Sequence, residues 1–442
     1  MIPGETIDKL INLLYPFDYS ITGIHNDLSC EILQTILPFK VSSYPTGTEL
    51  NGWVVPRAWR LNYLRVFKDG KLLFEFTDHP FCVPKNTISI DVDNLSYQEL
   101  IGRINRSVTG YSDDFVYDWR NLYRNSPLDW SLCLTEDMIS QLAEGSVYRV
   151  AIDSTFYDSA LKVLEFDTHP DIETTIVVNA HNCHPYQAND DISGIVAGIL
   201  LAQLWAKELE PRFNLRLLIA PELYGPMFYL DSLGENGNFL GAVLLKGIGN
   251  SGTLKLQQSV QESSLVSEVA TRLFHEKDSS NLIHSFRTLY GNDEIVFENP
   301  PYCIPTITLT RIPFTEYHNS SDIPARISTA SVIQTIEVAH QILKACNGNT
   351  AYHWASKGLP KLSDLTQGLY KPTRAQGIHN LGDGEIEKRW HVLMNCLPAL
   401  VHQGADALFL SKKFDLPLLE IIEYVAKWEA AGFLKKTKDE LK

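Results

Sequence analysis

The sequence has no surplus of positive charge, and this absence excludes one broad class of function. Its 53 acidic residues outnumber its 38 lysines and arginines, which gives a formal net charge of -15. A surface of this sign offers no broad basic region to neutralise phosphates, so a general nucleic-acid role is not expected. With 44% hydrophobic and 21% charged residues, the composition is that of a globular protein.

Long apolar runs are also missing. The most apolar stretch, residues 192–205, is too short to cross a bilayer. The first residues, MIPGETIDKL, lack the basic start and continuous apolar core of a signal peptide. We therefore expect a cytoplasmic protein with no membrane partner.

Paired cysteines are absent as well. The seven cysteines are scattered without a CxxC pair, at Cys30, Cys82, Cys133, Cys183, Cys303, Cys346 and Cys396. An odd number at such spacings predicts neither a disulfide framework nor a thiolate zinc site. We expect most of these thiols to be reduced and buried, and only Cys183 lies among potential metal ligands.

What the sequence does contain is a succession of different periodic patterns, and its length of 442 residues predicts two or three cores. Residues 1–38 contain two helical patterns, and residues 39–146 contain short alternating runs with a hairpin turn at residues 68–71, typical of a small β-rich domain. In residues 147–350, β-branched runs alternate with helical patterns. This predicts an α/β domain, made of residues 1–38 and 147–350, with a largely parallel sheet and helices on both faces.

The C-terminal part has a third pattern. Residues 353–380 show little periodicity and are interpreted as a linker. Three helical segments and a short closing strand follow in residues 381–442, an order compatible with a winged-helix domain. A plain three-helix cap on the main domain is the alternative.

Potential metal ligands follow three of the predicted strands. His181, His184 and Asp190 come after residues 175–179, Glu222 comes after 215–220, and His318 comes after 304–310. Strand ends of this kind form the ligand-binding edge of an α/β sheet, and imidazole and carboxylate are ordinary zinc ligands. Each residue alone has a simpler interpretation, as a helix cap, a helix N-terminal acid or a loop histidine. Their occurrence together favours a metal site.

These segments resemble the metallo-aminopeptidases of the co-catalytic zinc clan. More closely, the chain resembles a bacterial family of aminopeptidase-like proteins with an inserted β-domain and a C-terminal winged helix, often sited in polysaccharide-biosynthesis loci. The likeness covers essentially the whole chain and is carried by Ser20-Ile-Thr-Gly23, Pro45-Thr-Gly47, Trp53-Val-Val-Pro56 with Trp59, Asp129-Trp130 with Cys133, Cys183-His-Pro185, Asn189-Asp-Asp-Ile-Ser-Gly194, Pro221-Glu222, Gly291-Asn-Asp-Glu294 and Glu316-Tyr-His318.

The resemblance implies a role for each matching residue. Asp190 corresponds to the bridging aspartate, His318 to the late histidine ligand and Glu222 to the general base. For the first histidine, His184 is favoured over His181, and both stay open. Two carboxylates of the clan are missing, one at Leu223 and one near Leu245-Lys246-Gly247. One zinc per chain is therefore expected in place of two.

Three further residues are candidates for substrate binding. Asp293 can hold a substrate ammonium group or supply a substitute carboxylate, and a solvated loop acid is the alternative. Tyr317 and Arg311 flank the third strand end and are expected to contact substrate, unless Tyr317 serves packing and Arg311 is a surface charge.

The expected chemistry is hydrolysis of an amide. Zinc with an open position polarises a carbonyl and acidifies water, and Glu222 is left to accept the proton. This predicts a metal-dependent aminopeptidase or amidohydrolase acting on a small peptide-like or amino-acylated substrate. The alternative is a non-catalytic metal-binding regulatory protein that docks a protein partner through the winged helix. Assembly into a homo-oligomer is left open.

Overall fold

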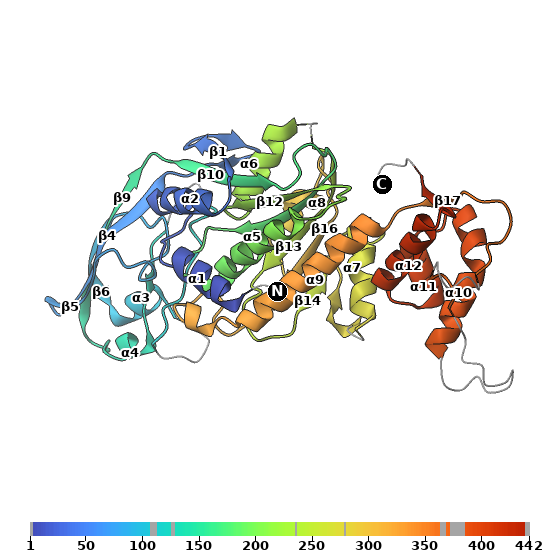
Figure 1. Ribbon diagram of the computed structural model, residues 1–442. Helices are drawn as coiled ribbons and strands as arrows, with labels where there is room; N and C mark the ends of the chain where they lie inside the picture. Colours follow the sequence, from blue (N-terminus) through green and yellow to red (C-terminus); the bar gives the residue numbers. More distant parts are fainter. Residues whose placement is uncertain are drawn as a thin grey trace.

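The computed structural model describes residues 3–106, 113–124, 129–234, 237–277, 280–362, 368–371 and 385–437 (Figure 1). Its centre is an eight-stranded sheet. In spatial order its strands are β1 (Lys40–Pro45), β10 (Ala160–Asp167), β12 (Asn214–Ala220), β11 (Thr175–His181), β13 (Phe239–Lys246), β16 (Thr306–Thr310), β14 (Lys255–Gln257) and β15 (Ile283–His284). The four strands from β12 to β16 run parallel. Strand β10 pairs antiparallel with β1 and β12, and β14 pairs antiparallel with β16 and parallel with β15.

Helices cover both faces of this sheet, as the sequence predicts. One face packs against α1 (Gly4–Leu14), α2 (Ile24–Ile36), α5 (Ser193–Trp205), α7 (Leu265–His275) and α9 (Thr329–Gly348). The other packs against α6 (Tyr224–Leu233) and α8 (Glu294–Glu298). Every residue of β11 is buried, the polar Thr175, Asn179 and His181 included, because helices cover both faces of this parallel strand. The apolar helix α5 is buried almost completely for the same reason.

A second, antiparallel sheet lies at one end of the molecule (Figure 1). It contains β5 (Lys71–Phe76), β4 (Ala58–Lys68), β9 (Val147–Tyr157) and β6 (Ile90–Ser96), and it has its own core. Smaller elements accompany it: β2 (Glu49–Leu50), β3 (Trp53–Val54), α3 (Tyr97–Ile101), β7 (Ile104–Asn105), β8 (Leu132–Cys133) and α4 (Glu136–Ile139). The predicted hairpin joins β4 and β5 through Asp69 and Gly70, both with positive φ.

Sheet membership departs from the predicted boundaries of the insert. Strand β1 falls inside the predicted insert of residues 39–146, yet it pairs with β10 in the large sheet. Strand β9 falls inside the predicted α/β domain, yet it pairs with β4 and β6 in the small sheet. The two sheets thus exchange one strand at each end of the insert.

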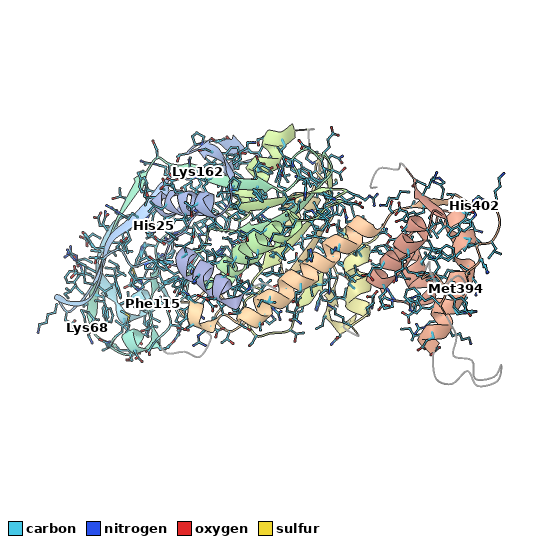
Figure 2. The ribbon with its side chains drawn as sticks, viewed as in Figure 1. His25, Lys68, Phe115, Lys162, Met394 and His402 are labelled. Atoms are coloured by element: carbon cyan, nitrogen blue, oxygen red, sulfur yellow. The ribbon has the colours of Figure 1, made fainter. Side chains whose placement is uncertain are left out.

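The C-terminal part contains α10 (Glu385–His402), α11 (Ala407–Phe414), α12 (Leu418–Ala430) and β18 (Leu434–Lys436), and β18 pairs with β17 (Tyr352–Trp354). The predicted linker therefore begins within a strand, and its residues 363–367 and 372–380 lie outside the described part. Side chains such as Met394 on α10 fill the interior between these helices (Figure 2). No helix of the described residues has the length and apolarity to cross a membrane.

Candidate metal centre

The carboxyl ends of the parallel strands bring the candidate ligands to one place. His181 ends β11 and Lys246 ends β13, while Glu222 and His318 follow β12 and β16. Asp190 lies in the short turn of helix η1 (Ala188–Ile192), between β11 and α5, and is completely buried. The structure thus places the predicted residues at a common edge of the sheet.

Asp190 is at the centre of this group. Its Oδ1 lies 3.1 Å from His181 Nε2 and its Oδ2 lies 3.1 Å from His318 Nε2. The ammonium group of Lys246 contacts the same Oδ1. Burial alone would raise the pKa of Asp190, but Lys246 and the neighbouring histidines hold it well below its ordinary value, so the group is a carboxylate.

A second aspartate fixes the backbone at Asp190. The carboxylate of Asp322 accepts hydrogen bonds from the backbone N–H groups of Asn189, at 2.7 Å, and Asp190, at 3.0 Å. Asp191 accepts a third from Gly247 at 3.1 Å. A side chain at Gly194 would place its Cβ 2.5 Å from the Asp191 carboxylate, so this turn requires a glycine there. Residues 189–194 therefore fix the position of the Asp190 carboxylate in addition to beginning α5.

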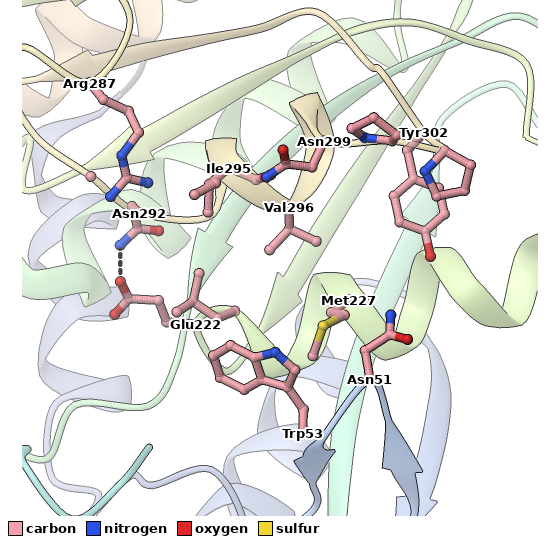
Figure 3. Close-up of a pocket in the computed structure, with 14 residues that line it drawn as sticks. Asn51, Trp53, Glu222, Met227, Arg287, Asn292, Ile295, Val296, Asn299 and Tyr302 are labelled. Carbon is pink, nitrogen blue, oxygen red and sulfur yellow. Dashed lines mark hydrogen bonds between the residues drawn. The ribbon is translucent and has the colours of Figure 1, made fainter. Parts of the chain in front are cut away.

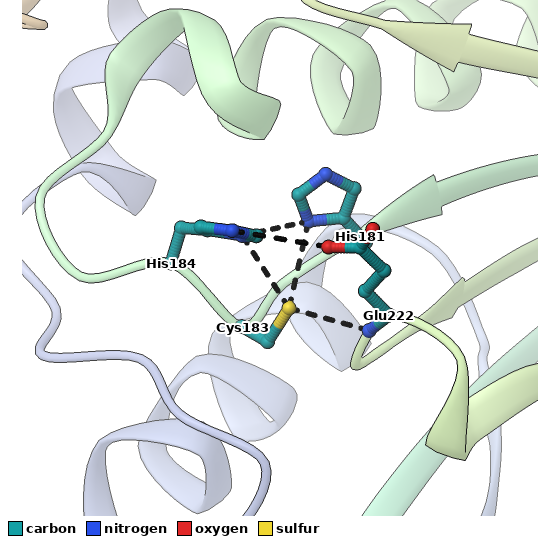
Figure 4. A group of neighbouring side chains, drawn as sticks. All are labelled: His181, Cys183, His184 and Glu222. Atoms are coloured by element: carbon teal, nitrogen blue, oxygen red, sulfur yellow. Dashed lines mark hydrogen bonds and ion pairs between the residues drawn. The ribbon is translucent and has the colours of Figure 1, made fainter. Parts of the chain in front are cut away.

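His184 joins the group from the other side (Figure 4). Its Nδ1 lies 3.2 Å from His181 Nδ1 and 3.4 Å from Cys183 Sγ, and its Nε2 lies 3.8 Å from Glu222 Oε2. Burial raises the pKa of Cys183 well above its ordinary value, so it is a neutral thiol, and its sulfur accepts the backbone N–H of Glu222 at 3.2 Å. The cysteine supports this loop.

Two sets of side chains have a spacing that suits a metal ion. Ligand atoms of His184, Asp190 and His318 lie within 4.8 Å of one another, and the same holds for His181, Cys183, His184 and Glu222. Burial lowers the pKa of all three histidines, that of His181 to about 4, so their rings are neutral and have lone pairs to offer. The second set is the poorer metal site, because metal ligands must be deprotonated. Burial favours the protonated forms of its Cys183 thiol and its Glu222 carboxyl group.

The first set also contains two polar atoms without a hydrogen-bond partner. Within the described residues, neither Asp190 Oδ2 nor His318 Nε2 has one, although both are buried and face each other. Buried polar atoms are rarely left unpartnered, because removing them from water without compensation is unfavourable. A cation bound by both atoms satisfies them, and imidazole and carboxylate donors fit zinc.

Glu222 stands beside this set as the predicted general base. Its carboxylate accepts a hydrogen bond from Asn292 Nδ2 at 2.7 Å and another from the Tyr123 hydroxyl at 3.4 Å. Burial raises its pKa to about 7. The sequence predicts neither of these hydrogen-bond partners of Glu222. Tyr123 comes from the predicted insert, and Asn292 is the neighbour of Asp293, the residue of the run 291–294 which the sequence marks as a candidate.

The three predicted substrate residues have different positions. Tyr317 stacks on the His318 ring with centroids 3.8 Å apart, so it lies at the centre. Asp293 is completely buried and accepts the backbone N–H of Leu223 at 2.6 Å, which positions the Glu222 loop. Arg311 is buried and donates to Ser331 O at 3.0 Å and Gln334 Oε1 at 2.6 Å on α9, so the structure does not bring it to the centre.

A cavity of about 410 Å³ opens beside Glu222 (Figure 3). Apolar residues line it from opposite sides: Ile295 and Val296 face Trp53 and Met227, and Leu223 and Tyr302 also belong to the lining. Asn292 and Arg287 lie at the end nearest Glu222, where the dashed hydrogen bond joins Asn292 to Glu222. The cavity therefore offers space for a side chain next to the candidate base.

Known proteins resemble this chain in sequence and in fold. A Clostridium acetobutylicum protein named for polysaccharide biosynthesis and an aminopeptidase-like domain is 23% identical over 354 residues, which is 79% of each chain. A crystal structure from the same organism, described as that of a peptidase, has a TM-score of 0.80 at 20% identity and covers 98% of this chain and 96% of its own.

The fold also resembles that of a Bacillus subtilis zinc aminopeptidase. That structure has a TM-score of 0.55 at 14% identity and covers 77% of this chain and 93% of its own. The family model of a domain of unknown function, DUF4910, matches residues 8–349. The chain therefore belongs to the DUF4910 family, whose aminopeptidase-like fold the sequence motifs had indicated.

Proposed function

We propose that the protein is a metal-dependent aminopeptidase or amidohydrolase that holds one zinc ion on His184, Asp190 and His318. The observation that carries this proposal is the pair of unpartnered buried atoms, Asp190 Oδ2 and His318 Nε2, which face each other at 3.1 Å. The zinc aminopeptidase fold supports it, as does the spacing of the three ligands.

The proposed reaction uses Glu222 as a base and then as an acid. Zinc, when bound, polarises the substrate carbonyl and makes the attacking water more acidic. The Glu222 carboxylate accepts the proton of that water and passes it to the leaving amine. The hydrogen bonds from Asn292 and Tyr123 fix the orientation of Glu222 for both transfers.

The proposed substrate is small and amino-acylated. The apolar lining of the cavity next to Glu222, which includes Trp53 and Met227, fits an aliphatic or aromatic side chain. Because one relative is named for polysaccharide biosynthesis, amino sugars acylated with amino acids belong in the substrate panel. We further propose that α10–α12 with β17 and β18 form a winged-helix domain that docks a protein partner.

The proposal is tested with the full-length protein. We expect about one zinc per chain after dialysis, and release of a chromogenic amine from aminoacyl anilides that have apolar side chains. A chelator should abolish this release and added zinc should restore it. Zinc without turnover across the aminoacyl and acyl-amide panel would contradict the hydrolase and favour a regulatory metal-binding protein.

A further inference from the structure

Lys246 is a charged side chain that the proposed reaction does not use. It ends β13 among the strand ends of the metal centre, and its side chain is 1% exposed. Its ammonium group contacts both Asp190 Oδ1 and His181 Nε2. The ring of Tyr290 covers it, with the nitrogen 5.4 Å from the ring centroid.

The two contacts of Lys246 are with atoms that a metal ion would otherwise bind. A lysine ammonium has three donors and no acceptor, so His181 Nε2 must accept and its lone pair is occupied. The proton of the His181 ring is then on Nδ1, where the sulfur of Cys183 at 3.7 Å accepts it, so His184 keeps a lone pair for the metal. The same ammonium occupies Asp190 Oδ1. The Nε2 lone pair of His181 therefore accepts a hydrogen bond from Lys246 and is not available to a metal ion.

The two oxygens of Asp190 thus have different surroundings. Oδ1 lies against Lys246, and Oδ2 lies 3.1 Å from His318 Nε2 without a hydrogen-bond partner among the described residues. A buried carboxylate is stabilised by a positive charge beside it. At Asp190 the Lys246 ammonium supplies that charge at Oδ1, and the position beside Oδ2 is left for a metal ion.

We infer that Lys246 is a fixed cation that fills one of two cation positions beside Asp190 and so limits the centre to one metal ion. This inference rests on the proposed function for the metal at the other position. It makes His181 a positioning residue and leaves His184 as the first histidine ligand.

The decisive variants are Lys246→Asp and Lys246→Met. The aspartate places a carboxylate beside His181 and Asp190, which completes a second set of nitrogen and oxygen ligands in the space that the ammonium leaves. We expect about two zinc ions per chain in this variant and about one in wild type and in Lys246→Met. The measurement is zinc content by mass spectrometry after dialysis, with thermal unfolding in the presence of zinc as the check on folding.

A second variant decides the question if Lys246→Asp does not fold. We expect His181→Ala to keep about one zinc, with affinity lowered by no more than about 100-fold, as for a residue that only supports a ligand. Loss of that zinc would overturn the inference, as would about two zinc ions in wild type.

The result also separates this inference from the proposed function. If wild type binds no zinc, the proposed function fails. The step from Lys246→Met to Lys246→Asp still tests Lys246, because the aspartate should then add about one zinc where the methionine adds none. Equal zinc content in the two folded variants would overturn the inference.

Discussion

Two groups of charged side chains in this molecule, one half-buried and one buried, differ in one respect. In the first, Arg216 donates two hydrogen bonds of 2.7 Å to Asp167 and one of 2.8 Å to Tyr229, whose hydroxyl contacts Glu165. In the second, around Asp190, two buried atoms have no such partner within the described residues. Because buried polar atoms are seldom left without a partner, the Asp190 group has capacity for a bound cation that the Arg216 group lacks.

The largest expected effect comes from removing a ligand in the Asp190 group. His318→Ala should reduce bound zinc from about one per chain to none and lower turnover by about 1000-fold or more, because several kcal/mol of charge stabilisation are lost with the metal. Zinc content and initial rates measure this.

The matched control is His340→Ala, a histidine on α9 whose ring lies at the edge of Trp205. That variant should keep both its zinc and its turnover. Retention of zinc by His318→Ala would contradict the proposal that His318 Nε2 and Asp190 Oδ2 bind the metal.

A smaller effect is expected from the base beside the same group. Glu222→Gln keeps the shape of the side chain and its hydrogen bond from Asn292, so zinc should stay bound. Turnover should fall by about 100-fold to 10,000-fold, because the amide cannot accept the proton. If zinc were lost together with turnover, Glu222 would be a ligand and the other set of side chains, with Cys183, would become the metal site.

The fully paired group should respond in stability instead. Arg216→Met leaves Asp167, whose side chain is 23% exposed, without its main partner. It also removes a weaker 3.7 Å contact from Glu165, which keeps Lys40 and Tyr229. The free energy of unfolding should fall by about 3 kcal/mol, measured by urea denaturation. Zinc content and turnover of the folded protein should not change.

A double-mutant cycle provides the control for that variant. Arg216→Met combined with Asp167→Asn should cost less than the sum of the two single changes, because the unpaired charge is then removed. If the double variant lost as much stability as the two single variants together, the ion pair would not be the source of the stability.

The residues of the Asp190 group were predictable from sequence because of where they stand. His181, Glu222 and His318 each follow a β-branched run, and the ends of parallel strands meet at one edge of a sheet. Lys246 also ends such a run, but the sequence comparison indicates only that a carboxylate ligand of the clan is missing near this position. The contact of Lys246 with His181 depends on the order of the strands in the sheet, which cannot be predicted from the sequence pattern.

Other features depend on long-range packing and gave no local signal. Arg311 has the sequence environment of a surface residue but is buried against α9. Tyr123 reaches Glu222 from the insert, 99 residues away in the chain. The exchange of β1 and β9 between sheets was missed because a run of residues that is continuously extended does not reveal its partner. The winged helix and its docking role remain predictions.

The smallest effect is expected where an ion pair is open to water. Asp415 pairs with Arg389 of α10 at 2.6 Å and with Arg272 of α7 at 3.2 Å, but 72% of its side chain is exposed. Because Asp415 has positive φ, which asparagine tolerates, Asp415→Asn removes the charge without strain. The loss should be under about 1 kcal/mol in urea denaturation at low salt.

Salt and pH distinguish this pair from the Arg216 group. In 1 M salt the Debye length falls to about 3 Å, so the difference between Asp415→Asn and wild type should vanish, whereas the cost of Arg216→Met should largely remain. Arg389 and then Arg272 lower the pKa of Asp415, so its contribution is present at neutral pH and is lost as the pH falls through that lowered value. An Asp415→Asn effect as large as that of Arg216→Met would mean that burial does not set the strength of these pairs.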